Sequence, residues 1–186
     1  MSALYLIRHG RTEANRRRLY CGSTDLPLDG EGLEELASLG DLYRDLAGCR
    51  FITSGMARTE QTLSALFGDV PHEIVPGLRE IDFGVFEMHS WEQLRDRADY
   101  QAWISGDNEK NVPPGGESGA QMTARVLAAF RALDLGEDTV IVTHGGVIAA
   151  IMAHLFPGEG KDRYQWQPEP GLGYRVEGSD WRPLEK

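Results

Sequence analysis

The stretch Leu4-Tyr5-Leu6-Ile7-Arg8-His9-Gly10 decides the fold class. Its short apolar run stops at a charged turn, a pattern typical of a strand that is buried on both faces of a parallel sheet. Phe51-Ile52-Thr53 and Thr139-Val140-Ile141-Val142-Thr143 are similar, and the latter is almost wholly β-branched, as strands prefer. The sequence therefore predicts a buried strand at each of these places.

Helical patterns lie between these strands. Apolar residues recur at roughly helical spacing in 30–46, and Ser90 and Ser118 each precede a glutamine at the capping-box spacing that opens a helix. The expected helices cover residues 30–46, 91–103, 119–133 and 147–156. Strands that alternate with helices predict a three-layer α/β/α fold, with a mostly parallel sheet and helices on both faces.

Length and composition limit the class of protein. The chain has 186 residues, of which 41% are hydrophobic, and no linker or repeat divides it, so residues 1–186 are expected to form a single domain. The packed part should extend from about Ala3 to Glu177, with residues 178–186 as a tail. The formal charge of −10 disfavours binding to nucleic acid or to anionic membranes.

Cysteine usage and hydropathy bear on the cellular compartment. Cys21 and Cys49 are the only cysteines, too few for a disulfide framework, so a reducing cytoplasm is expected, although one disulfide between them stays open. No stretch of the sequence approaches the roughly 18 apolar residues that cross a bilayer. We therefore expect a soluble, cytoplasmic protein.

Residues with useful chemistry follow the predicted strands. Ligands of α/β sheets bind at the carboxyl ends of the strands, and there the sequence places His9, Arg58 and His144. The segment from Arg8 to Arg18 holds five arginines and one acid, a local reversal of charge. Because arginine grips phosphate oxygens in pairs, this segment indicates an anion site, while residues 16–18 alone also fit a solvated surface run.

Five motifs follow one another along the chain. They are Leu6-Ile7-Arg8-His9-Gly10 with Thr12 and Asn15, Ser54 to Thr62 with Arg58, Leu78 to Gly84 with Glu80, Pro114-Gly115-Gly116-Glu117-Ser118, and Val142-Thr143-His144-Gly145-Gly146. The series resembles that of the histidine phosphatase superfamily, in its phosphoglycerate mutase-like branch, and covers nearly the whole chain. It implies a phosphoglycerate mutase-like fold with a small helical insertion at about 90–115, here called the cap segment.

The resemblance also implies roles for the motif residues. His9 is expected to attack phosphorus and form a phosphohistidine, with its other ring nitrogen held by a backbone carbonyl. Arg8, Arg58 and His144 are expected to surround the phosphoryl group, and Glu80 to act as general acid and then general base. Further residues expected to touch or support the substrate are Thr12, Asn15, Cys21, Gly22 and Gly145.

No metal or other cofactor is expected, because arginines supply the positive charge. His9 and His144 with Glu80 or Asp82 would also suit a metal-dependent hydrolase, but arginines in the same cluster would repel a dication. Taken alone, Glu80 fits an ordinary salt bridge and His144 a tight turn. The combination of motifs is what indicates catalysis.

Departures from the family pattern bear on the substrate. Arg11, Ala14, Thr59 and Met88 stand where many relatives carry an acid, a tryptophan, an alanine and a glycine, respectively. We expect these positions to lie at the rim of the pocket. They therefore put the identity of the substrate in question, and leave the reaction as the motifs imply.

The cap segment favours a phosphatase over a mutase. Mutases of the family hold a bisphosphate with basic residues there, whereas this cap segment has only scattered bases among acids, at Arg95, Arg97 and Lys110. We expect a metal-independent phosphomonoesterase that acts on a small phosphorylated metabolite and releases phosphate. The stretch from Tyr20 to Leu28 resembles that of α-ribazole phosphatases, which makes α-ribazole 5′-phosphate one candidate substrate.

Two alternative functions stay open at this point. One is a cofactor-dependent phosphoglycerate mutase, and the other is a catalytically silent module that binds phosphate or another protein. The presence of all five expected catalytic residues argues against the silent module. The oligomeric state and the physiological substrate do not follow from the sequence.

Overall fold

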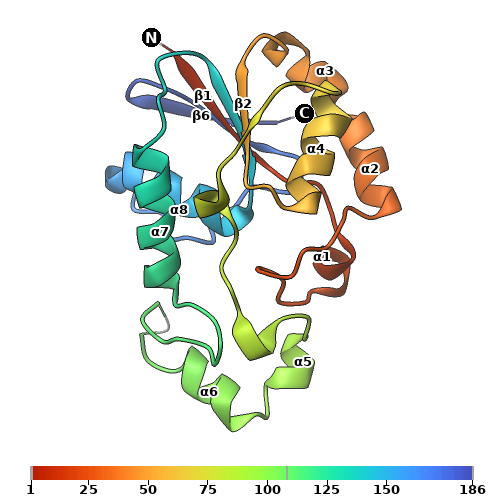
Figure 1. Cartoon of the computed structure of the whole chain (residues 1–186). Coiled ribbons are helices and arrows are strands. Elements are labelled where there is room, and N and C mark those ends of the chain that lie inside the picture. The colour runs from red at the N-terminus through yellow and green to blue at the C-terminus, as the bar shows by residue number, and fades with distance from the viewer. Residues whose placement is uncertain (1, 108, 186) are drawn as a thin grey trace.

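A mixed sheet forms the centre of the computed structural model, which describes residues 2–107 and 109–185 (Figure 1). The strand order is β3-β2-β4-β1-β5-β6. The strands are β1 (Ala3–Arg8), β2 (Arg50–Thr53), β3 (Glu73–Ile74), β4 (Thr139–Thr143), β5 (Gly173–Glu177) and β6 (Asp180–Leu184). Strands β1 to β4 pair in parallel, and β5 and β6 are antiparallel. The predicted strands and the mostly parallel sheet are confirmed.

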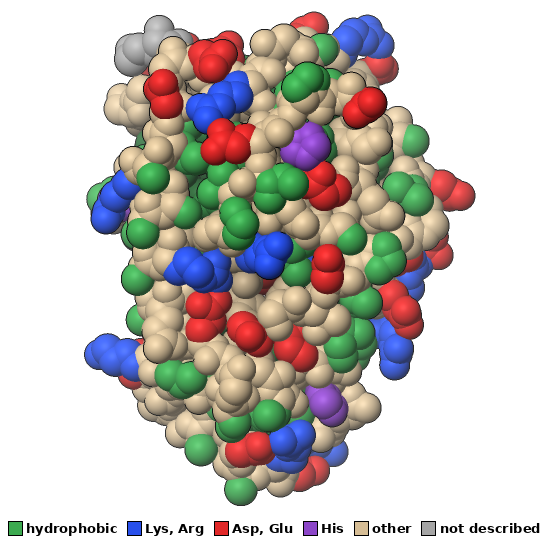
Figure 2. Space-filling view, in the orientation of Figure 1, with side chains coloured by type: hydrophobic (Ala, Val, Ile, Leu, Met, Phe, Trp, Pro, Cys, Tyr) green, Lys and Arg blue, Asp and Glu red, His purple; other side chains and the backbone are tan. Residues whose placement is uncertain are grey.

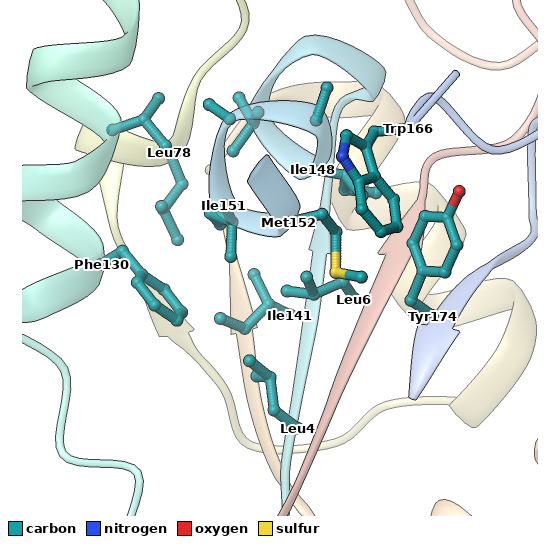
Figure 3. Close-up of a cluster of buried hydrophobic side chains, with 14 of the residues drawn as sticks. Leu4, Leu6, Leu78, Phe130, Ile141, Ile148, Ile151, Met152, Trp166 and Tyr174 are labelled. Carbon is teal, nitrogen blue, oxygen red and sulfur yellow. The ribbon is translucent and has the colours of Figure 1, made fainter. Parts of the chain in front are cut away.

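Alternating side chains of the central strands supply the two halves of the core. Leu4, Leu6 and Ile141 face α7 (Gly119–Arg131) and α8 (Gly145–Leu155), as Figure 3 shows, and Trp166 closes this side. Ile7 and its strand neighbours face α2 (Gly30–Ala37), α3 (Gly40–Tyr43) and α4 (Ala57–Phe67). Helices therefore cover both faces of the sheet, as predicted, and fix the directions of its strand ends.

Two of the predicted helices are shorter and broken. The helix expected over 30–46 ends at Ala37, where the Ser38 hydroxyl donates to the Glu35 carbonyl, and the rest of this range forms α3 and a 3₁₀ turn at Arg44–Leu46. The helix expected over 91–103 is divided into α5 (Trp91–Leu94) and α6 (Ala98–Ile104). Leu94 and Tyr100 are six residues apart, so their side chains would point in different directions in a continuous helix. The break between α5 and α6 lets both side chains pack in the same small cluster.

Other boundaries also differ from the prediction. The last helix begins at Gly145, earlier than expected, and the short helix α1 (Glu13–Arg17), which was not predicted, begins four residues after β1 ends. Single 3₁₀ turns cover Arg44–Leu46, Pro76–Leu78, Gly84–Phe86 and Pro157–Glu159.

The predicted C-terminal tail is wrong, because residues 180–184 form the edge strand β6. Leu184 is buried in the core, and Trp181 packs its ring 4.9 Å from that of Trp166. The sequence did not predict this strand, because residues 180–184 include polar residues and Pro183, which are uncommon in strands. Proline is tolerated there because an edge strand can leave one side of its backbone unpaired.

The cap segment lies beyond the carboxyl ends of the strands (Figure 1). Two aromatic rings of α6, Tyr100 and Trp103, pack against Tyr20, Phe83 and Phe86 of the body, with ring centroids 5.3–6.0 Å apart. These contacts are edge-on except for the tilted one between Phe86 and Trp103. The Tyr20 and Tyr100 hydroxyls share a 2.6 Å hydrogen bond. The cap segment is thus packed on the body through its own small core.

Charges on the surface are mixed. On the face in Figure 2, basic and acidic side chains alternate over both the body and the cap end. Arg16, expected within a free surface run, is paired with Asp29 at 2.6 Å and also with Glu31. Among the described residues, no helix combines the length and the apolar character that a bilayer-spanning segment needs.

Candidate active site

Three neighbouring strands deliver their following residues to one place. Strands β2, β4 and β1 are adjacent in the sheet, and Ser54, His144 and His9 come immediately after them. The His9 and His144 rings lie 5.2 Å apart, and His9 is only 6% exposed. The parallel sheet therefore brings together residues that are far apart in the sequence.

The His9 ring is held by the backbone that follows it. Its Nδ1 lies 2.7 Å from the carbonyl oxygen of Gly10, the type of contact expected from the sequence. A carbonyl only accepts, so Nδ1 carries the proton and Nε2 keeps its lone pair when the ring is neutral. Burial, and then Arg58 and Arg8, hold the pKa of His9 well below its ordinary value of 6.5. His9 is therefore neutral, with an unprotonated Nε2, at neutral pH.

Two arginines lie close to this ring. Arg58 is 1% exposed, and its terminal nitrogens donate to the carbonyls of Thr24 and Gly22 at 2.9 and 2.8 Å. Arg8 donates to the Pro168 carbonyl at 2.7 Å. The Nε atom of each arginine is buried without a hydrogen-bond partner among the described residues. Buried cations with unused donors suit an anion that enters between them.

His144 completes the same group. Its Nε2 lies 2.8 Å from the Ser54 hydroxyl, and its Nδ1 is buried without a partner in the described part of the chain. Burial, followed by Arg58, His9 and Arg8, holds the pKa of His144 well below 6.5. We call Arg8, His9, Arg58 and His144 the phosphate floor.

Glu80 lies at the start of α8. Its two carboxylate oxygens accept from the backbone N–H groups of Ile81 at 2.9 Å and Gly146 at 3.0 Å. A Cβ at position 146 would come within 2.5 Å of this carboxylate, so a larger residue there would displace Glu80 from its place. Glu80 also lines the same cavity as Arg8. It can therefore exchange a proton with a group held at the phosphate floor.

The other predicted residues divide into two groups. Asn15 and Cys21 line the cavity beside Arg8. Thr12 is buried and caps α1, with its hydroxyl and N–H both bonded to the Asn15 amide oxygen, so it acts through Asn15. Gly22 is buried, and its carbonyl holds Arg58. Gly145 lies against the Arg8 guanidinium, where a Cβ would be 3.2 Å from its central carbon.

A cavity with a volume of about 350 Å³ lies beside the phosphate floor, and Arg8 is the floor residue that lines it. Apolar side chains form one side of it, and we call this set the apolar wall: Tyr20, Phe83, Trp103, Ile104 and Tyr164. Arg163 also lines the cavity and is paired with Glu109. The sequence did not identify this wall, because its members come from four separate segments and share no motif.

Glu87 is a further residue that sequence reasoning missed. Its carboxylate accepts from the backbone N–H groups of Gly22, Ser23 and Thr24, at 2.9–3.3 Å, and from Phe83 at 3.0 Å. The loop that it holds presents the carbonyls that bind Arg58. Its place three residues after the Leu78 to Gly84 motif was the available signal.

Residues 2–107 and 109–185 contain no cluster of three or more His, Cys, Asp or Glu side chains arranged to hold an ion. Cys21 and Cys49 are both free thiols.

Known proteins share this sequence and fold. The family model of the histidine phosphatase superfamily (branch 1) matches residues 4–179. An adenosylcobalamin/alpha-ribazole phosphatase of Salmonella typhimurium is 33% identical over 90% of this chain and 86% of its own length. A probable phosphoglycerate mutase GpmB of Enterobacter sp. is 30% identical over 83% of this chain and 75% of its own.

Solved structures agree with these sequence matches. The alpha-ribazole phosphatase from Shigella flexneri superposes with a TM-score of 0.81 at 27% identity, over 97% of this chain and 94% of that one. The phosphoglycerate mutase-like α/β fold is therefore confirmed, and the protein is a phosphatase with a small phosphorylated substrate and phosphate as product. The chain belongs to the histidine phosphatase superfamily.

Proposed function

We propose that the protein hydrolyses phosphomonoesters through a phosphohistidine formed on His9, without a metal. The observation that carries this proposal is the unprotonated Nε2 of His9 next to Arg8, Arg58 and His144, each of which has a buried, unused nitrogen. A phosphoryl group that accepts from these three residues would have its charge neutralised and its phosphorus close to His9. Positioning and charge neutralisation are the main requirements of phosphoryl transfer.

In the first step, Nε2 of His9 attacks phosphorus as the bond from phosphorus to the ester oxygen breaks. Glu80 gives its proton to the departing oxygen, so the alcohol leaves neutral. In the second step, water attacks the phosphohistidine, Glu80 takes a proton from that water, and the phosphorus–nitrogen bond breaks. Phosphate leaves, and His9 and Glu80 return to their starting states.

For the substrate, we propose α-ribazole 5′-phosphate or a similar ester with a flat, apolar leaving group. The relatives named above include phosphatases of alpha-ribazole. The apolar wall supports the same substrate, because Tyr20, Phe83 and Trp103 line the cavity that Arg8 also lines. A planar aromatic base can stack there, while its phosphate enters the floor.

The bases of the cap segment argue against a mutase. Arg97 is paired with Asp99 at 2.7 Å, Lys110 with Asp107 at 3.0 Å, and Arg95 lies over the Trp91 ring. None of the three bases is among the cavity-lining residues of the described chain. A second phosphate would therefore lack a free cation from the cap segment.

The same proposal covers the organisation and location of the protein. We propose that the whole chain is one phosphatase domain in which the cap segment selects the substrate. It acts in the cytoplasm on a small molecule, without a nucleic-acid or membrane partner, as its net charge of −10 favours.

The test is phosphate release in EDTA from a panel that contains an aryl phosphate, α-ribazole 5′-phosphate, fructose 2,6-bisphosphate and phosphoglycerates. We expect turnover without metal, fastest with α-ribazole 5′-phosphate, and an acid-labile phosphate on the quenched enzyme. His9→Ala should lose both signals while phosphate still binds. Activity that EDTA removes and zinc or manganese restores would contradict the metal-free mechanism. Transfer between phosphoglycerate positions would favour the mutase, and binding without any turnover the silent module.

A further inference from the structure

A turn at residues 162–168 lies between the phosphate floor and the apolar wall, and we call it the recognition turn. The Pro168 carbonyl at its end accepts the 2.7 Å hydrogen bond from Arg8. Tyr164 and Gln167 of the same turn line the cavity that Arg8 also lines. The recognition turn is therefore joined to the floor at one end and contributes Tyr164 to the wall.

Local contacts fix the shape of the recognition turn. The Asp162 carboxylate accepts from the N–H groups of Tyr164 at 2.8 Å and Gln165 at 2.9 Å. The side-chain oxygen of Gln165 accepts in return from the Asp162 N–H at 2.9 Å. Trp166 is fully buried in the core, and the Lys161 ammonium lies 4.3 Å from the centre of its ring. The turn is therefore ordered before a substrate binds, which lowers the entropy cost of a contact with it.

Gln167 has an unused amide. Neither its side-chain oxygen nor its side-chain nitrogen has a hydrogen-bond partner among the described residues. The other five glutamine side chains of the chain all make a hydrogen bond: Gln61, Gln93, Gln101, Gln121 and Gln165. Asn15 also lines the cavity, but its amide oxygen is bonded to the Thr12 N–H and hydroxyl. Gln167 therefore offers the cavity both a donor and an acceptor.

The Gln167 amide lies next to the phosphate floor. A Cβ on Gly145 would be 3.0 Å from the Gln167 side-chain oxygen and 3.2 Å from the central carbon of the Arg8 guanidinium, so these two groups are close neighbours. Tyr164 is three residues earlier, and its carbonyl accepts from the Gln167 N–H at 3.2 Å. Gln167 therefore faces the part of an ester that connects its phosphate to an apolar group at the wall.

We propose that Gln167 is a specificity-determining residue that binds the hydroxyl groups of a sugar placed between the phosphate and a flat base. A carboxamide both donates and accepts, as a hydroxyl does, so the two groups satisfy each other. The substrate class is then the 5′-phosphate of a ribose that carries a planar base. Its phosphate lies at Arg8, its ribose at Gln167 and its base at the apolar wall. This inference rests on the proposed function and assigns the part of the substrate that neither the floor nor the wall contacts.

The first test removes the hydroxyl groups from the ligand. In His9→Ala, which blocks turnover, titration calorimetry measures the Kd of adenosine 5′-monophosphate and of its 2′,3′-dideoxy analogue. The ribose form should bind about 3- to 10-fold more tightly, which is the net value of one hydrogen bond. Adding Gln167→Leu keeps the size of the side chain and removes the amide, so the ratio of the two Kd values should fall to about one.

Gln101→Leu is the matched control, because Gln101 is an exposed glutamine of α6 that does not line the cavity. In this variant the ratio of the two Kd values should stay as in His9→Ala. Equal binding of the two nucleotides by His9→Ala would overturn the proposal. A ratio that Gln167→Leu and Gln101→Leu leave equally intact would also overturn it.

The second test measures hydrolysis by the protein that retains His9. Gln167→Leu should lower kcat/KM for α-ribazole 5′-phosphate by about 3- to 10-fold more than for a sugar-free aryl phosphate. Equal losses for the two esters would contradict recognition of the sugar and indicate that Gln167 acts on the phosphate through Arg8. If no ester is hydrolysed, the proposed function fails, whereas the ratio of Kd values still decides the role of Gln167.

Discussion

The phosphate floor and the apolar wall are built in opposite ways, and Arg8 is the floor residue that lines the same cavity as the wall. Three of the four floor residues lie directly at the ends of β1 and β4. His9, Arg58 and His144 are buried, and backbone carbonyls hold Arg8, His9 and Arg58. The wall is partly exposed, up to 72% at Tyr164, and comes from loops and the cap segment. Rigid strand ends suit chemistry that needs fixed geometry, whereas loops can vary to select leaving groups.

The largest effect should come from Glu80→Gln. This variant keeps the contact with Gly146 N–H but can no longer supply a proton. Hydrolysis of an alkyl phosphate should slow by about 10²- to 10⁴-fold, the usual contribution of general acid catalysis, because its alkoxide is a poor leaving group. An aryl phosphate with an acidic phenol is the control and should slow much less. Equal losses for both esters would contradict the acid role and assign Glu80 to positioning alone.

The second effect concerns stability and pH, and it belongs to the floor. The folded-state pKa values of His9 and His144 lie well below 6.5, so below that pH the unfolded chain binds protons that the folded protein does not. The free energy of unfolding should therefore fall with decreasing pH, by up to about 1.4 kcal/mol per pH unit for each histidine. Urea unfolding between pH 7.5 and about 5.5 measures this slope, before most carboxylates titrate.

Variants separate the histidines that contribute to this slope. His144→Asn should reduce it by about half, since one of the two buried rings is gone. His72 acts in the opposite sense, because the Val70 carbonyl and Glu60 raise its pKa, and His72→Asn should steepen the slope slightly. A slope that is unchanged in His144→Asn would contradict a neutral, buried His144.

The third effect tests the wall without touching the floor. Trp103→Ala should raise KM for α-ribazole 5′-phosphate by about tenfold, the value of one aromatic contact with its buried area. KM for a small alkyl phosphate should change little, since such a substrate does not reach the wall. Trp91→Ala is the matched control, because Trp91 is also in the cap segment but is 50% exposed and does not line the cavity. Equal changes in both variants would contradict selection by the wall.

The same contrast explains what the sequence could predict. His9 and His144 follow β-branched or apolar runs directly, so local pattern and strand order were sufficient to bring them together. Trp103 and Tyr164 meet through long-range packing, which no local pattern encodes. Helix α2 ends early because the Ser38 hydroxyl bonds to the Glu35 carbonyl, which the apolar spacing does not reveal. Strand β6 was not predicted because its partner strand, β5, was not predicted either. Local signals thus describe the floor well and the wall poorly.

The smallest effect concerns Met88, which lies between the two regions. Met88 has a φ of 60°, and its N–H donates to the Tyr20 carbonyl at 2.7 Å, so it fixes a wall residue next to the Glu87 anchor of the floor. A residue with a side chain loses about 1–2 kcal/mol of stability in this left-handed conformation. Glycine avoids this loss, but its greater conformational freedom in the unfolded chain offsets part of the gain.

Met88→Gly should therefore raise the free energy of unfolding by roughly 0.5 kcal/mol relative to Met88→Ala, which keeps the Cβ and its strain. The urea midpoints of the two variants measure this difference, and comparison with alanine removes the contribution of the methionine side chain. The bond from the N–H of residue 88 to the Tyr20 carbonyl is a backbone bond that both variants keep. We therefore expect kcat to be unchanged. If alanine stabilised the protein as much as glycine, the methionine side chain and not the backbone would be the source of the strain.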